Sequence, residues 1–234
     1  MSKKDLPTQR PGADPVESFL MEVAHTPPPA PGSGRGRLIF AMDATASREP
    51  TWDRACQVQG QMFLETAALG GLDVQLVYYR GFDECRASRW VDNPGDLVRL
   101  MTGVFCLAGQ TKLGRVLQHA VRETEKKRVA ALVFVGDCFE ETLDEVGQTA
   151  GQLGMLGVRA FLFQEGHNPQ AERAFRHIAK LTNGVHCRFD SSSPRQLRDL
   201  LGAVAAYAAG GQRALADLSR RSSPEVRLLA RQVR

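Results

Sequence analysis

Apolar and polar positions alternate in blocks along the chain, and each block has the period of a strand or a helix. From residue 37 onward, short runs of branched and aromatic residues predict strands, and longer runs with apolar residues three or four positions apart predict helices. The predicted strands are residues 37–43, 72–81, 85–91, 129–137, 158–166 and 185–190. The predicted helices are residues 51–70, 94–103, 111–127, 141–157, 169–184 and 193–210.

The order of these elements predicts a doubly wound, Rossmann-like α/β fold. Strands that alternate with helices form a mainly parallel sheet, here of about six strands, with helices on both faces. Residues 85–91 follow the preceding strand too closely for a crossover helix. We therefore expect them to return antiparallel as an edge strand.

The two ends of the chain differ in composition from this central domain, which we place at residues 37–210. Residues 1–36 contain seven of the twelve prolines and predict a flexible arm, with residues 16–23 as a short docking helix or a transient turn. Residues 211–234 predict a basic, partly helical tail. A solvated helix with a frayed end is favoured for it over a segment that binds an acidic partner or a membrane surface.

Composition excludes several classes of function. The net charge is only +4 and the basic residues are scattered through most of the 234 positions, which argues against a nucleic-acid-binding protein. No run of 18 apolar residues and no signal peptide is present, so we expect a cytoplasmic protein without a membrane span. The five cysteines include no CxxC pair and indicate free thiols. The GxSxG and GxxxxGK[ST] motifs are absent.

Polar residues stand where the predicted strands end, at the edge of the sheet where open α/β folds bind ligands. Asp43, Thr45 and Ser47 follow the first strand, Thr111 precedes a helix, and Asp137 closes strand 129–137. An extended loop would place the first three on one side. The resulting set of two carboxylates and three hydroxyls suits Mg²⁺, with Mn²⁺ as the second candidate. For any one of these residues alone, a helix or turn cap is the alternative.

These residues resemble the metal-ion-dependent adhesion site (MIDAS) of the von Willebrand factor type A (VWA) domain, in its bacterial intracellular form. The family pattern is DxSxS followed by a later Thr and a later Asp. Asp43 matches the first Asp, Thr45 and Ser47 the hydroxyl positions, Thr111 the isolated Thr, and Asp137 the last Asp. The resemblance covers about residues 37–210. Thr45 replaces the first Ser, and Cys138 stands where the family commonly has Gly. A small thiol packed beneath the strand end is favoured for Cys138 over a ligand for a softer metal.

The resemblance implies a non-enzymatic adaptor, in which the metal binds an Asp or Glu of a partner protein. Intracellular bacterial members of the family often act in multiprotein assemblies with ATPases or chaperones. Arg48 and Trp52 follow the metal-binding loop closely and are candidates for partner contacts, because both residue types are enriched in binding hot spots. Burial of Trp52 at the start of its helix is an equal alternative.

Two other classes of function remain open. A phosphohydrolase of the haloacid dehalogenase type would use Asp43 as its nucleophile. Its general acid would then be Thr45, which cannot supply a proton near neutral pH as a carboxyl group can. The other class is a structural protein of VWA fold with a vacant metal site, suggested by Thr45 and Cys138. Its melting temperature would not respond to Mg²⁺ or Mn²⁺.

Overall fold

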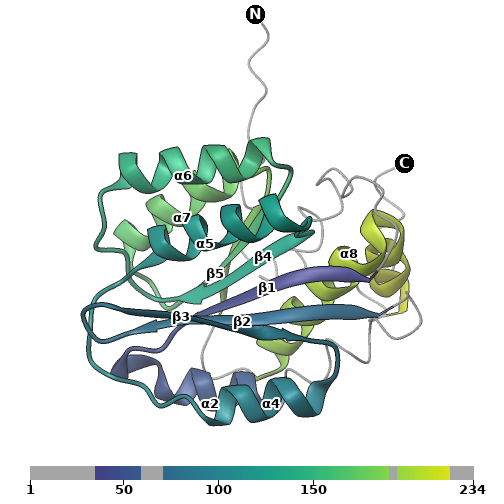
Figure 1. Cartoon of the computed structure of the whole chain (residues 1–234), viewed down its shortest axis with the longest axis horizontal. Coiled ribbons are helices and arrows are strands. Elements are labelled where there is room, and N and C mark those ends of the chain that lie inside the picture. The colour runs from purple at the N-terminus through teal and green to yellow at the C-terminus, as the bar shows by residue number, and fades with distance from the viewer. Residues whose placement is uncertain (1–34, 59–70, 190–193, 222–234) are drawn as a thin grey trace, which may run out of the picture.

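A six-stranded sheet runs through the centre of the computed structural model, which describes residues 35–58, 71–189 and 194–221 (Figure 1). The strand order is β3-β2-β1-β4-β5-β6. The strands are β1 (Gly36–Asp43), β2 (Leu72–Arg80), β3 (Glu84–Val91), β4 (Ala131–Gly136), β5 (Arg159–Glu165) and β6 (Val185–Phe189). Neighbouring strands are parallel except for β2 and β3, which are antiparallel. The predicted doubly wound α/β fold with one antiparallel edge strand is thus confirmed.

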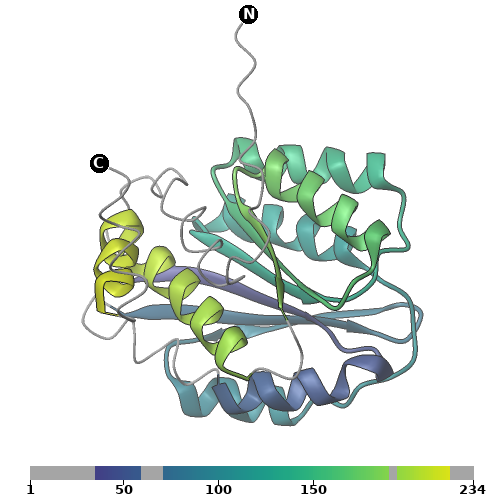
Figure 2. The same cartoon turned by 180° about the vertical axis from the view of Figure 1, so that it is seen from behind.

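Helices cover both faces of the sheet (Figures 1 and 2). One face carries α2 (Glu49–Val58), α4 (Pro94–Thr102) and α8 (Pro194–Arg221), and the other carries α5 (Leu113–Lys126), α6 (Leu143–Met155) and α7 (Pro169–Leu181). A short 3-10 helix, η1 (Ala46–Arg48), connects β1 to α2. None of the described helices is long and apolar enough to cross a membrane.

Several predicted segments extend beyond the described residues. Of the helix predicted at 51–70, the structure describes the part up to residue 58, and residues 59–70 lie outside the described residues. The same holds for residues 1–34 of the arm and 222–234 of the tail. Gly36 belongs to β1 rather than to the arm. Helix α8 continues past residue 210 and includes a break at Gly211, whose φ of 69° is the left-handed conformation that glycine tolerates.

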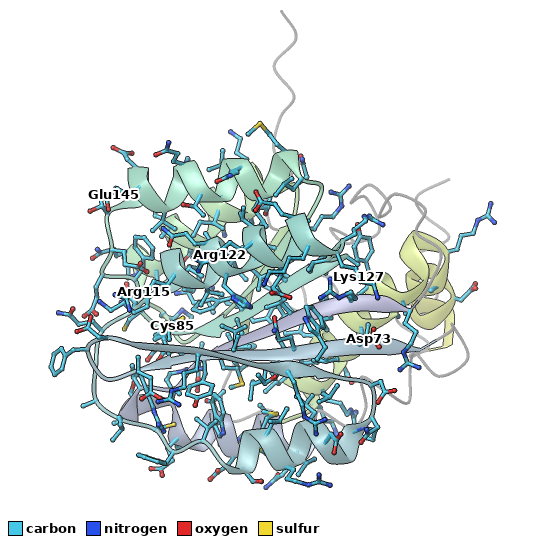
Figure 3. The ribbon with its side chains drawn as sticks, viewed as in Figure 1. Asp73, Cys85, Arg115, Arg122, Lys127 and Glu145 are labelled. Carbon is cyan, nitrogen blue, oxygen red and sulfur yellow. The ribbon has the colours of Figure 1, made fainter. Side chains whose placement is uncertain are left out.

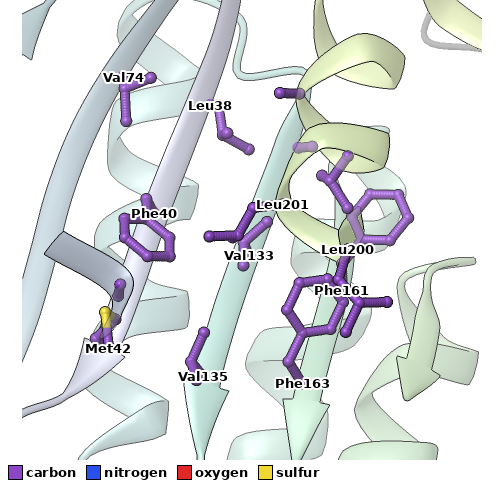
Figure 4. Packing of buried hydrophobic residues seen from close by; sticks show 14 of the residues in the cluster. Leu38, Phe40, Met42, Val74, Val133, Val135, Phe161, Phe163, Leu200 and Leu201 are labelled. Atoms are coloured by element: carbon purple, nitrogen blue, oxygen red, sulfur yellow. The ribbon is translucent and has the colours of Figure 1, made fainter. Parts of the chain in front are cut away.

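The core lies on both sides of the central strand β1, and its side chains alternate between the two faces. Leu38, Phe40 and Met42 pack with the face that carries α8 (Figure 4), whereas Ile39 and Ala41 pack with the face that carries α5. All five are fully buried. A strand that is covered on both faces reads as a continuous apolar run, which explains the sequence before Asp43.

A buried histidine in β6 makes the stability of the fold depend on pH. His186 is 8% exposed, and its Nε2 lies 3.0 Å from Oε1 of Gln164 on β5. Burial lowers the pKa of His186 from 6.5 to about 4. The folded protein therefore holds this imidazole neutral at a pH where the unfolded chain would protonate it.

We expect the free energy of unfolding to fall as the pH drops from 6.5 toward 4, since the unfolded chain then binds a proton that the folded chain excludes. The full loss from this group is about 3 kcal/mol. His186→Gln, whose amide can donate to the same oxygen, should flatten the fall, and His177→Gln at an exposed position should not. Urea unfolding at a series of pH values measures this, and equal slopes in wild type and His186→Gln would contradict it.

Candidate metal centre

The carboxyl ends of β1 and β4 lie side by side at the middle of the sheet, where the strand order reverses. β1 pairs with β2 on one side, and β4 pairs with β5 on the other. In such folds a crevice forms at this point. Here it holds a pocket of about 230 Å³. In Figure 3, Cys85 and Arg115 mark this end of the molecule, and Asp73 and Lys127 mark the opposite end.

All five residues predicted as metal ligands line this one pocket. They come from three separate segments: Asp43, Thr45 and Ser47 after β1, Thr111 before α5, and Asp137 after β4. The rest of the lining is Ala46, Ala108, Gly109, Cys138 and Glu140. The structure therefore brings the sequence-predicted set together in space.

A turn brings the polar side chains of the loop after β1 together, and not the extended conformation that we expected. The carboxylate of Asp43 accepts a hydrogen bond from the Thr45 amide at 2.8 Å, which closes a tight turn. Thr45 is extended, but the chain then enters η1, where the Arg48 amide donates to the Thr45 carbonyl at 2.9 Å. The turn and the 3-10 helix together place Thr45 and Ser47 on the same side as Asp43.

Hydroxyl contacts connect this loop to the end of β4. Oγ1 of Thr45 lies 3.4 Å from Oγ of Ser47. The Ser47 hydroxyl in turn lies 3.4 Å from Oδ2 of Asp137, to which it donates. Three oxygen-bearing side chains from two strand ends therefore follow one another along the pocket wall.

Thr111 faces the pocket and does not cap helix α5. Its hydroxyl accepts from the Glu140 amide at 3.0 Å, and its own amide donates to the Glu140 carboxylate at 3.3 Å. The start of α5 is held instead by Glu141, which accepts from the Leu113 amide at 2.6 Å and the Gly114 amide at 3.0 Å. Because Glu141 satisfies the helix terminus, the Thr111 hydroxyl keeps a lone pair for a ligand.

The loop that carries Thr111 is fixed against the turn between β2 and β3. Gln110 donates through its amide to the Gly81 carbonyl at 3.2 Å, and the Leu107 amide donates to the Ala44 carbonyl at 3.0 Å. Gly109 meets Gly81 so closely that a Cβ at position 109 would lie 1.9 Å from the Gly81 carbonyl oxygen. Only glycine fits at position 109, and the loop can therefore pack directly against the turn between β2 and β3.

Arg48 and Trp52, the candidates for partner contacts, are both buried, so the structure corrects their proposed role. Arg48 is 1% exposed. Trp52 packs in the core edge-on to Tyr78, and its Nε1 donates to the Met101 carbonyl at 3.1 Å. The reason is that η1 and α2 turn under the sheet and carry these side chains inward. The burial that was the alternative for Trp52 is what the structure shows.

Arg48 instead forms a buried ion pair beneath the candidate pocket, which sequence reasoning missed. Its Nη1 contacts the carboxylate of Glu165 at the end of β5, and the Thr51 hydroxyl donates to the same carboxylate at 2.5 Å. Burial lowers the pKa of Arg48, while the negative charges of Asp137 and Asp43 act in the opposite direction. The sequence signal that could have indicated this ion pair was the position of Glu165 at the end of β5, the strand next to β4.

The carboxylate of Asp43 lies in a strongly desolvated position. Asp43 is 1% exposed. Burial raises its pKa, and the hydrogen bonds from Thr45 and the charge of Arg48 partly offset this. Nearby, the Tyr79 hydroxyl and two nitrogens of Arg48 are buried without a hydrogen-bond partner among the described residues. A buried carboxylate in this setting is stabilised by a cation.

The donor set fits Mg²⁺. The candidate ligands are all oxygens, as a hard cation requires, and neighbouring ligands of an octahedral Mg²⁺ lie roughly 3 Å apart. The two separations of 3.4 Å along Thr45, Ser47 and Asp137 are close to this value. Within the described parts of the chain, no group of three or more His, Cys, Asp or Glu side chains has metal-binding geometry. Binding at the pocket would therefore depend on the hydroxyls.

Cys138 lines the pocket, but its contacts are those of a packed thiol. Its Sγ accepts from Nδ2 of Asn168 at 3.7 Å. Burial and the neighbouring charge of Asp137 raise its pKa, which favours the thiol over the thiolate that a softer metal would need. The preference for a small thiol beneath the strand end agrees with these contacts.

The pocket differs from the phosphohydrolase alternative at the position of the general acid and in its basic residues. Among the described residues that line it, there is no lysine, arginine or histidine. Thr45 occupies the position two residues after Asp43 where the general acid would stand. At this position the chain carries a hydroxyl, which cannot supply a proton near neutral pH as a carboxyl group can.

Comparison with known proteins places the fold. No protein-family model and no curated protein matches the sequence. Among solved structures, a von Willebrand factor type A protein from Catenulispora acidiphila is similar, with a TM-score of 0.62 and 15% identity over 76% of this chain and 43% of that one. The SpRpn10 VWA domain is similar with a TM-score of 0.56 and 13% identity over 71% of this chain and 94% of that one.

A third similar structure is the pilus adhesin SpaC from Lactobacillus rhamnosus, with a TM-score of 0.57 and 9% identity over 78% of this chain and 31% of that one. The chain thus spans less than half of the Catenulispora and SpaC chains and nearly all of the SpRpn10 domain. At these identities the comparisons define the fold. The chain has the fold of a VWA domain, with the candidate pocket at the carboxyl ends of its central strands.

Proposed function

We propose that this protein is a metal-dependent protein-binding module and not an enzyme. In this proposal Mg²⁺, or Mn²⁺ as the second candidate, binds a carboxylate of a partner protein. The ligands are the set defined above: Asp43, Thr45, Ser47, Thr111 and Asp137. The observation that carries the proposal is that these five oxygen-bearing side chains, from three distant segments, line one open pocket.

Each residue has a distinct role in this proposal. Asp43 and Asp137 supply two negative charges, which balance a divalent cation, and the hydroxyls complete the set without adding charge. Bound Mg²⁺ would offer an open coordination position to one carboxylate oxygen of the partner. Arg48 lies below the pocket and is paired with Glu165, which offsets part of its charge, and the remainder acts on Asp43 and Asp137. The result is directional binding of an Asp or Glu side chain without turnover.

The similar structures support binding rather than catalysis as the role of this fold. One of them is an adhesin by its name, and another is named as a VWA domain. The resemblance to the bacterial intracellular form extends the proposal to a cytoplasmic adaptor that joins an ATPase or chaperone assembly. The proposed function involves neither a nucleic acid nor a membrane-spanning segment.

Capture of partners from native lysate, with and without a chelator, tests this function. A tagged full-length chain is expected to retain partner protein in Mg²⁺ and to release it in EDTA. Asp43→Ala should fail to retain the same protein, whereas Asp144→Ala, at an exposed position in α6, should behave as wild type. Retention that survives both the chelator and Asp43→Ala would exclude the pocket from the binding mechanism.

A further inference from the structure

Large apolar side chains are exposed on two loops beside the candidate pocket. Phe82 in the turn between β2 and β3 is 71% exposed, and Phe105 and Leu107 in the loop before α5 are 60% and 41% exposed. We call these three residues the apolar rim. Elsewhere in the described residues, the exposed large hydrophobic side chains are Met155 and Leu156, at the end of α6 that leads into β5.

Phe105 is held at the surface by an arginine. The guanidinium of Arg80 lies 4.1 Å from the centroid of the Phe105 ring, and its Nη1 donates to the Phe105 carbonyl at 2.8 Å. Nε of the same guanidinium donates to the Glu84 carboxylate at 2.7 Å. Because Arg80 is fixed at both ends, the ring has a defined position before any partner binds. A preformed apolar surface lowers the entropy that binding costs.

The apolar rim and the pocket are parts of the same backbone unit. The Gly81 amide donates to the Leu107 carbonyl at 3.5 Å, which joins the turn that carries Phe82 to the loop that carries Phe105. The next two residues of this loop, Ala108 and Gly109, line the pocket. A bound segment with a carboxylate in the pocket would therefore have its neighbouring side chains against the rim.

The charges around the rim favour apolar over acidic neighbours of that carboxylate. Arg80 is paired with Glu84. Arg115, on the first turn of α5, donates to the Asp83 carbonyl at 2.7 Å and lies 3.5 Å from its carboxylate. Arg80 and Arg115 each have a carboxylate partner, with Glu84 shared between Arg80 and Arg86. A second acidic residue of a partner would therefore gain less there than beside an unpaired arginine.

We propose that the partner is a protein segment in which the metal-binding Asp or Glu is flanked, within a few residues, by large apolar side chains such as Leu, Phe or Met. This assignment rests on the proposed function, because the metal fixes the carboxylate. The apolar rim then supplies the selectivity between one acidic residue and another, which the metal alone does not provide.

A display library of random peptides, selected on the full-length chain in Mg²⁺ and eluted with EDTA, tests the proposal. The eluted peptides are expected to share an acidic residue with large apolar residues nearby. Their affinity, measured by fluorescence anisotropy, should fall about ten-fold in Phe105→Ser and Phe82→Ser, a change of about 1.4 kcal/mol each. Met155→Ser, at a position on α6 that is 84% exposed, should bind as wild type. The Mg²⁺-dependent rise in melting temperature should be unchanged in all three variants.

The outcomes separate this inference from the proposed function. If Asp43→Ala abolishes binding but Phe105→Ser and Phe82→Ser do not weaken it, the rim is not a contact surface and the metal-dependent function stands. Peptides that are not released by EDTA would count against both. Tighter peptide binding in the arm variant Phe19→Ser/Leu20→Ser would assign the rim to the chain's own residues 16–23. A dimer in light scattering that Phe105→Ser dissociates would assign it to a second copy. Either result would overturn the partner assignment.

Discussion

Replacement of Arg48 by methionine is expected to lower the free energy of unfolding by about 3–5 kcal/mol in the absence of added metal. The guanidinium is 1% exposed and pairs with Glu165, and it acts electrostatically on both Asp43 and Asp137. Methionine fills much of the same volume but removes the charge. The Glu165 carboxylate and the two pocket carboxylates then lose a buried counter-charge. Urea unfolding in EDTA measures the loss.

A second variant distinguishes the ion pair from packing. Arg48→Met/Glu165→Gln removes both charges, so we expect it to be more stable than Arg48→Met alone, because no carboxylate is left unpaired at position 165. Arg86→Met is the matched control, since the Arg86 side chain on β3 is 68% exposed and its pair with Glu84 is a surface contact. A loss below about 1 kcal/mol in Arg48→Met would show that Arg48 does not compensate these carboxylates.

The same charge affects metal binding in the opposite direction. A guanidinium close to Asp43 and Asp137 repels a divalent cation that these carboxylates attract. We therefore expect Mg²⁺ to stabilise Arg48→Met more than it stabilises wild type at the same concentration. In the metal-free chain the positive charge of Arg48 would partly balance the charge of the buried Asp43 carboxylate. The fold could therefore remain stable when no metal ion is bound.

The sequence predicted the fold because its strongest signals are periodic. Strand β1 is buried on both faces and reads as an unbroken apolar run, and α5 has apolar residues at helical spacing. The edge strand β3 followed from the short connection before it. Four of the pocket residues were predictable for a related reason, since parallel strands in such a sheet end at one edge. Thr111 precedes a helix, and the resemblance to the family pattern added it to the set.

What the sequence did not reveal depends on contacts between distant segments. An arginine in a loop is usually exposed, and nothing local to Arg48 indicates its pairing with Glu165, more than a hundred residues away. The turn that aligns Thr45 and Ser47 depends on a hydrogen bond to Asp43, which an alternation of residue types does not encode. The apolar rim likewise depends on how two loops meet at Gly81 and Gly109.

Asp43→Asn is expected to abolish the stabilisation of the fold by Mg²⁺. At a Mg²⁺ concentration one hundred times Kd, a site present only in the native state contributes about 2.7 kcal/mol. For a domain of this size that corresponds to a rise of about 5–10 °C in melting temperature. Asparagine keeps the shape and the acceptor for the Thr45 amide but removes the charge. Without metal we expect no loss of stability, because burial disfavours the charged carboxylate at this position.

The hydroxyl at position 45 gives a matched pair of variants for the same measurement. Thr45→Ser keeps the ligand oxygen and should retain the Mg²⁺ response, whereas Thr45→Val has the same shape without the oxygen and should lose most of it. Asp144→Asn, exposed on α6, is the control for charge alone. A wild-type melting temperature that stays constant through Mg²⁺ and Mn²⁺ titrations would favour the structural protein with a vacant site. A full response in Asp43→Asn would place the metal elsewhere. A Mg²⁺-dependent rise in melting temperature that is kept in Thr45→Ser and lost in Thr45→Val would assign the metal ion to this pocket.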